Sequence, residues 1–169
     1  MLYSRMLTLR LKRRAGGGSA FTLRRADGTS AWQRQERHAE FFAHHDLEHL
    51  AVERTLGLRG AFYGLVAAGW DFDDFLPPYP RGPLPAEALW AETIVGLLDV
   101  ERAAQGRAPL MSAAELNAHV ALKFEQDARV LPGAVSEPQL AEIRRQCDDL
   151  FERWNAVPTG ETLELSFSP

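Results

Sequence analysis

Leu7-Thr8-Leu9-Arg10-Leu11-Lys12 is the stretch that decides the fold, because leucine occupies every second position. A period of two is typical of a β-strand that buries one face and exposes the other. Residues 21–24 repeat the alternation after a glycine turn at residues 16–18. Asp27-Gly28 is a two-residue hairpin signal, and it leads into a third strand near residues 30–35. The N-terminal part of the chain is therefore expected to form a β meander.

A second alternating stretch lies near the other end of the chain, where Leu163, Leu165 and Phe167 are separated by polar residues. An isolated strand has no partner for its backbone hydrogen bonds. We therefore expect a closing strand at residues 161–167 that joins the N-terminal meander.

Residues 37–156 have the apolar spacing of helices. Ser112 with Glu115, and Ser136 with Gln139, are capping boxes that mark two helix starts. Five of the ten prolines fall within residues 71–85, which predicts an ordered loop without regular structure. Helices are expected at about 37–56, 60–69, 85–105, 112–127 and 136–154. The chain is thus expected to be a single α+β domain over residues 1–169, with a small antiparallel sheet (meander 1–36 plus the closing strand) packed against four to five helices.

Composition fits an ordinary globular domain, with 169 residues of which 46% are hydrophobic and 25% charged. The longest mostly apolar run, residues 61–70, is too short to span a bilayer. The single cysteine excludes an internal disulfide framework. We therefore expect a cytoplasmic protein that does not enter a membrane.

Charge is divided unevenly, since residues 1–37 carry a net charge of +7 and the remaining residues −11. Arg10, Lys12, Arg24 and Arg34, with Trp32 beside them, could form a sheet face for phosphate or single-stranded nucleic acid. Cationic side chains on the solvent side of a small sheet also protect it from edge pairing. Because the whole chain has a net charge of −4, nucleic acid is the less favoured partner.

The segment Phe41–Glu53 holds three of the five histidines. On a helical wheel at 100° per residue, His45, Asp46, His49 and Glu53 share one face, together with apolar side chains, whereas Glu48 points toward a more polar edge. The polar cluster therefore lies where a helix normally packs into the core. Buried ionisable groups are costly unless they pair with one another or bind a metal ion.

The spacing His45-x-x-x-His49-x-x-x-Glu53 gives three metal ligands from successive helical turns. Asp46 would be a fourth ligand or an acceptor for a histidine N–H. Glu92, the only charge in an apolar helical segment, is either a further candidate ligand or a residue on the one polar stripe of its helix, and the polar stripe is the more favoured of the two. Mixed nitrogen and oxygen donors favour a divalent transition metal over calcium, with zinc the first choice and iron, manganese and nickel as alternatives.

The string His45-Asp46-Leu47-Glu48-His49 resembles the H-E-x-x-H helix of zincin metalloproteases, with Asp46 in place of the glutamate, and it also fits the H-x-x-E-H of inverted zincins through Glu48. This resemblance implies a zinc-binding helix with an acidic proton acceptor. The wider pattern H-D-L-x-H-x-x-V-E is similar to that of a set of small bacterial proteins of unassigned function. That similarity covers about the first two helices and implies no activity.

Two functions follow from these residues. In the first, the protein is a metal-dependent hydrolase of a small-molecule or peptide substrate, with Asp46 as the catalytic residue. In the second, it is a non-catalytic binding or interaction module, and the cluster is a structural hydrogen-bond network. A catalytic metal needs an open position, so the first function predicts that His45 and His49 face a solvent-connected pocket bordered by residues 71–85. The sequence does not fix an oligomeric state.

Overall fold

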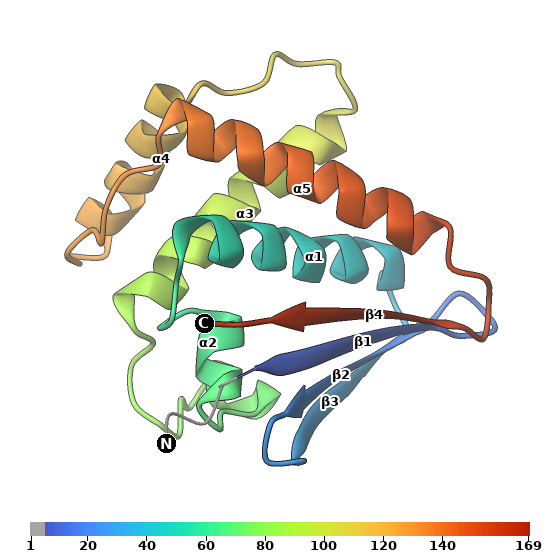
Figure 1. Ribbon diagram of the computed structural model, residues 1–169. Coiled ribbons are helices and arrows are strands. Elements are labelled where there is room, and N and C mark those ends of the chain that lie inside the picture. The colour runs from blue at the N-terminus through green and yellow to red at the C-terminus, as the bar shows by residue number, and fades with distance from the viewer. Residues whose placement is uncertain (1–5) are drawn as a thin grey trace.

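The computed structural model describes residues 6–169, which form one four-stranded sheet and five α-helices (Figure 1). The predicted α+β architecture is confirmed. The strands are β1 (Leu7–Arg13), β2 (Ser19–Arg25), β3 (Ser30–Gln35) and β4 (Thr162–Phe167). The helices are α1 (Ala39–Leu56), α2 (Phe62–Ala67), α3 (Ala86–Ala104), α4 (Ala113–Gln126) and α5 (Glu137–Asn155), with the short 3₁₀ helix η1 (Phe72–Phe75) between α2 and α3.

The sheet is antiparallel, with the order β3-β2-β1-β4. The closing strand β4 pairs with β1, as expected, and Leu9 of β1 lies opposite Leu23 of β2 and Leu165 of β4. The leucines of β1 are at most 2% exposed, so the alternation does bury one face of the sheet. The turn after β2 is one residue longer than the two-residue turn that Asp27-Gly28 predicts. It spans residues 26–28, because the backbone N–H of Arg25 donates to the carbonyl of Thr29.

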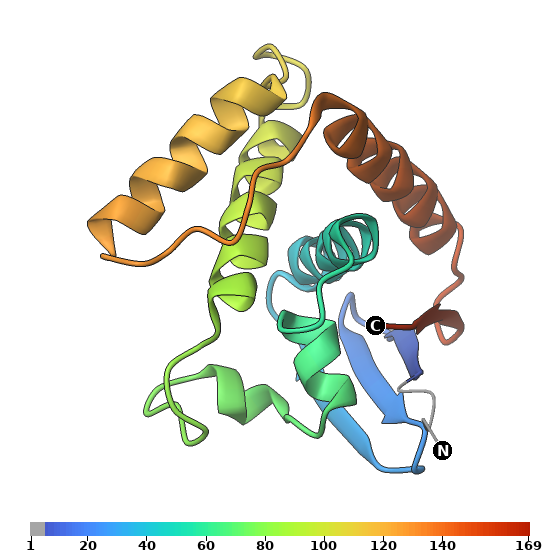
Figure 2. The same cartoon turned by 60° about the vertical axis from the view of Figure 1, so that its left-hand side comes forward.

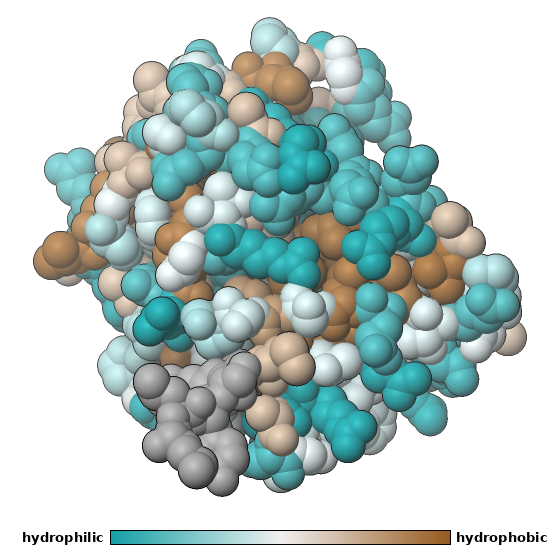
Figure 3. Space-filling view, in the orientation of Figure 1, coloured by the Kyte–Doolittle hydropathy of each residue, from teal (hydrophilic) through white to brown (hydrophobic). Residues whose placement is uncertain are grey.

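Helix α1 lies at the centre of the molecule. It runs between the sheet and α5 (Figure 1), and the rotated view shows it end-on with the sheet, α3 and α5 around it (Figure 2). Hydrophilic side chains cover most of the outer face seen in Figure 3, with apolar side chains showing between them. Because the sheet, α3 and α5 surround α1, side chains on several sides of this helix are buried, whether they are apolar or polar.

The helix starts predicted from the sequence are confirmed at α4 and α5. The hydroxyls of Ser112 and Ser136 accept the backbone N–H of the residue three positions later, and both capping boxes are complete. The proline-rich segment between α2 and α3 contains only η1 as regular structure. Among the helices of the described residues, none has the length and apolar character needed to cross a membrane.

Candidate metal centre

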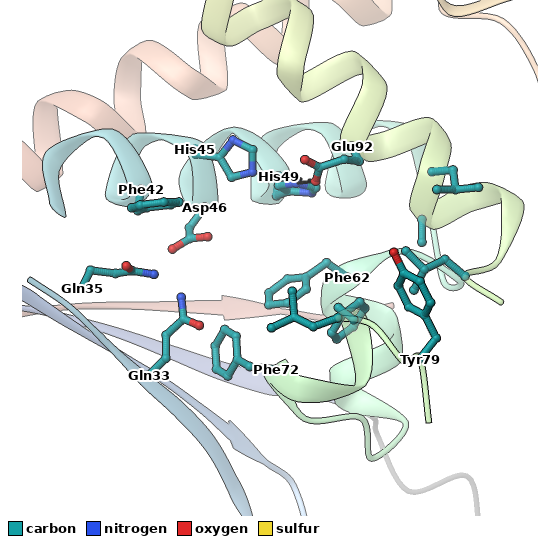
Figure 4. Close-up of a pocket in the computed structure, with 15 residues that line it drawn as sticks. Gln33, Gln35, Phe42, His45, Asp46, His49, Phe62, Phe72, Tyr79 and Glu92 are labelled. Atoms are coloured by element: carbon teal, nitrogen blue, oxygen red, sulfur yellow. Dashed lines mark hydrogen bonds and ion pairs between the residues drawn. The ribbon is translucent and has the colours of Figure 1, made fainter. Parts of the chain in front are cut away.

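Two histidines of α1 form the core of the candidate site. His45 and His49 lie one helical turn apart, and their ring centroids are 4.9 Å from each other. The Nε2 atom of His49 lies 2.9 Å from Oε2 of Glu92 on α3, and Nε2 of His45 lies 3.8 Å from the same oxygen. Both imidazoles therefore direct the same ring nitrogen toward one carboxylate (Figure 4).

These three side chains meet the spacing requirement of a metal site. One ligand atom from each of His45, His49 and Glu92 can be chosen so that all three lie within 4.8 Å of one another. A single ion with ligand bonds of about 2.0–2.2 Å fits among atoms at that spacing after small side-chain movements. The sequence predicted all three residues as ligands, and the structure brings them together.

A second carboxylate stands behind each imidazole, on the side away from Glu92. Nδ1 of His45 lies 2.7 Å from Oδ2 of Asp99 and must donate to it, because a carboxylate only accepts. Nδ1 of His49 lies 3.4 Å from Oε1 of Glu53, which is close enough for an ion pair although the two atoms are not aligned as a hydrogen bond. Carboxylates on the outer nitrogens fix the ring orientation and leave Nε2 of each ring directed at Glu92.

Glu53 occupies a different place from the one that the His-x-x-x-His-x-x-x-Glu spacing predicts. Its side chain is fully buried, and its second oxygen accepts the backbone N–H of Tyr63 at the start of α2 at 2.9 Å. It faces Nδ1 of His49 and lies outside the two groups of side chains that could share an ion. The spacing brings Glu53 next to His49, but on the outer side of the ring.

Asp46 points into a cavity of about 570 Å³ that the two histidines and Glu92 also line. Figure 4 shows its carboxylate between α1 and the amide side chains of Gln33 and Gln35 on β3. Residues of the proline-rich loop form part of the cavity wall, and His45 and Glu92 keep 18% and 61% of their side-chain surface exposed. The predicted opening beside the loop is therefore confirmed.

A second polar group lies deeper, between α1 and α3. Glu48 is only 2% exposed and accepts from Nε of Arg102 at 3.0 Å, and Arg102 also donates to Asp99. The prediction that Glu48 points toward a polar edge is wrong, because α3 and α5 cover that side of α1 as well. His45, Glu48 and Asp99 could in principle share an ion. The Arg102 guanidinium already pairs with both of their carboxylates and disfavours a second cation there.

The pKa values show what holds the cluster together without an ion. Burial alone would lower the pKa of His49, but the carboxylates of Glu53 and Glu92 outweigh burial and raise it to about 10. The hydrogen bond from His49 holds the pKa of Glu92 below its usual value. Burial raises the pKa of Asp46 to about 7, although the nearby imidazoles oppose this change. A metal ion must therefore replace the proton on Nε2 of His49.

The sequence pointed to five of the important side chains and missed others. Asp99, Arg102, Gln33 and Gln35 belong to the site or its cavity, yet none was singled out. Asp99 had a detectable signal, because it follows Glu92 by seven residues, which is two turns along the same face of α3. Gln33 and Gln35 alternate on β3, so they share one face of the sheet, but glutamine there carries no specific signal.

No family model, curated protein or solved structure matches this chain.

Proposed function

We propose that the protein binds one divalent transition metal ion through Nε2 of His45, Nε2 of His49 and a carboxylate oxygen of Glu92. The observation that carries the proposal is the paired orientation of the imidazoles, each with a carboxylate at Nδ1 and with Nε2 directed at Glu92. Metal-binding histidines usually donate their outer N–H to such a partner. Zinc suits two imidazoles and one carboxylate, and manganese, iron and nickel remain alternatives.

The activity that we propose is hydrolysis. Three protein ligands leave a coordination position for water, and a bound ion brings the pKa of such a water toward 7. The cavity is lined by His45, His49 and Glu92, so it would admit a substrate whose acyl carbon lies next to the metal-bound water. Asp46 lines the same cavity, and its carboxylate would be the general base that accepts the proton of this water.

The proposed hydrolysis has two steps. The water oxygen forms a bond to the acyl carbon while Asp46 takes its proton. The bond from that carbon to the leaving oxygen or nitrogen then breaks, and the protonated Asp46 returns a proton to the leaving group. The products are a carboxylic acid and an alcohol or amine.

The competing function is an interaction module in which the cluster is only structural. It is favoured by the position of His49, which is 7% exposed at its side chain and lies between two carboxylates that pair with it in the absence of an ion. The two functions differ in whether Nε2 of His49 exchanges its proton for a metal.

Metal analysis separates the two functions. We expect protein purified without chelator to carry close to one equivalent of metal, and Glu92→Gln to lose it, because an amide oxygen is a weaker and uncharged ligand. The metal-loaded protein should hydrolyse p-nitrophenyl esters, and Asp46→Asn should reduce the rate more than it reduces metal content. Protein that carries no metal and binds neither zinc, nickel nor manganese at micromolar concentrations would leave the interaction module as the function.

A further inference from the structure

The cavity beside the candidate metal centre has two chemically different ends. Next to Asp46, the amides of Gln33 and Gln35 face the cavity, and within residues 6–169 no hydrogen bond holds either amide to another side chain. On the other side of His49 and Glu92, the wall is apolar and comes from the proline-rich loop and the first turn of α3. The proposed metal position lies between the two ends.

The apolar end is built by residues whose place follows from the helix geometry. Leu89 precedes Glu92 by three residues, so it lies one turn nearer the start of α3 on the same side. Leu76, Tyr79 and Leu84 of the loop also line the cavity, as do four phenylalanines, of which Phe42 and Phe72 lie near Asp46 and Gln33 (Figure 4). The partly buried side chains of Leu84 and Leu89 therefore leave apolar surface open to the cavity.

The charges of the lining exclude one large class of ligands. Asp46 and Glu92 are acidic, and among the described residues that line the cavity there is no lysine or arginine. Sites for phosphate esters normally supply such cations to the phosphate oxygens. A phosphorylated or polyanionic ligand would therefore meet two carboxylates and would find no lysine or arginine in the lining to balance its charge beyond the single metal ion.

From these observations we infer that the ligand of this cavity is a small uncharged acyl compound, an amide or ester, with an apolar tail. The acyl carbonyl lies at the metal position, the tail extends along Leu89 and Leu84, and the polar remainder is hydrogen-bonded by Gln33 and Gln35. A volume of about 570 Å³ accommodates a compound of this size. This inference rests on the proposed function for the place of the carbonyl, but the preference for an apolar tail does not require the ion.

The test uses straight-chain hydroxamic acids, which chelate a metal ion and differ only in the tail. Calorimetric titration of the metal-loaded full chain should show the dissociation constant falling by up to about fourfold for each methylene group that the cavity buries. Hexanohydroxamate should bind at least about 30-fold more tightly than acetohydroxamate. Adipic monohydroxamate, whose tail ends in a carboxylate, should gain little or nothing over acetohydroxamate.

Two variants locate the tail. Leu89→Asn and Leu84→Asn should each reduce the advantage of hexanohydroxamate to less than about fivefold and leave acetohydroxamate binding unchanged. Leu97→Asn is the matched control, since Leu97 is a half-buried leucine of α3 that does not line the cavity. Equal binding of the short and long hydroxamates, or tighter binding of the carboxylate-ended one, would overturn the inference.

A metal-free arm keeps the two proposals separate. In the presence of chelator, NMR titration with hexanamide and acetamide should still favour the longer tail and shift signals of the residues around Leu89. If the protein binds no metal but hexanamide is preferred, the proposed function fails and the ligand class stands. If metal binds and neither series shows a tail preference, the ligand class is wrong and the metal site stands.

Discussion

In the sheet, the charged side chains of Arg10 and Lys12 point to solvent while the leucines that alternate with them, Leu9 and Leu11, are buried. Helix α1 buries ionisable side chains together with apolar ones, because Glu48, His49 and Glu53 are at most 5% exposed. The sheet follows the partition that burial of apolar surface favours. Helix α1 departs from it, and a buried ionisable group is retained only where partners compensate for the lost hydration. The sheet thus supplies stability, and α1 carries the candidate site.

Removing β4 should have the largest effect, since it damages the region that supplies stability. A chain ending at Gly160 loses three apolar side chains that are at most 8% exposed, worth about 5–8 kcal/mol in total. That is comparable with the whole stability of a domain this size. We expect the truncated chain to be unfolded at 25 °C by far-UV circular dichroism. A chain lacking only Ser168 and Pro169, which follow β4, is the control. An unchanged melting temperature for the truncated chain would show that β4 is an appendage.

His49→Ala should be the most damaging single substitution in α1. It removes a proposed metal ligand and leaves the buried carboxylate of Glu53 without its imidazole partner. We expect complete loss of bound metal by elemental analysis and a loss of about 3 kcal/mol of stability in urea unfolding of the metal-free protein. His119→Ala on α4 is the control, because His119 is exposed. Retention of one equivalent of metal in His49→Ala would place the ion elsewhere.

The same contrast explains how much could be predicted from the sequence. Strands and helix starts depend on local signals, such as the leucine alternation of β1 and the Ser136 capping box, and these predictions are confirmed. The proximity of His45 and His49 is also local, because it follows from the pitch of one helix.

Contacts between elements could not be obtained in this way. A helical wheel assumes one buried face, but α1 is enclosed by the sheet, α3 and α5, so Glu48 is buried against expectation. The pairing of His45 with Asp99 depends on how α3 crosses α1. That crossing is set by packing of the whole core and leaves no local pattern in the chain.

Asp46→Asn tests the burial of ionisable groups on α1 through the pH dependence of stability. The folded chain holds the Asp46 proton more tightly than the unfolded chain does, since burial raises the pKa from 3.8 to about 7. The carboxyl group therefore lowers stability as pH rises from about 4 to 7. An asparagine cannot ionise, so the variant should be more stable than the wild-type chain at pH 8 by up to about 4 kcal/mol, and nearly equally stable at pH 4.

Urea unfolding at both pH values, with chelator present, measures this difference. Asp148→Asn on α5 is the control for the same change of side chain at an exposed position. The buried Glu48 titrates in all three chains and cancels from the comparison. Parallel pH profiles for the wild-type chain and Asp46→Asn would show that Asp46 is well solvated, and so ill suited to act as a base.

Glu53→Gln should have the smallest effect, and it tests whether the buried carboxylate behind His49 serves the metal. Glutamine keeps an oxygen that accepts the N–H of Tyr63, but its amide can donate a hydrogen bond to Nδ1 of His49. The imidazole would then carry its proton on Nε2, the atom that faces Glu92 and the proposed ion. We expect metal affinity in competition with a chromogenic chelator to fall about tenfold, with the fold intact.

The matched control for this substitution is Glu87→Gln on α3. The carboxylate of Glu87 also accepts backbone N–H groups, those of Arg59 and Gly60, but no histidine lies against it. Loss of a carboxylate that only holds a backbone turn should leave metal affinity unchanged. Equal affinity losses in the two variants would mean that Glu53 acts through the backbone at the start of α2, whereas a loss confined to Glu53→Gln assigns it to the orientation of His49.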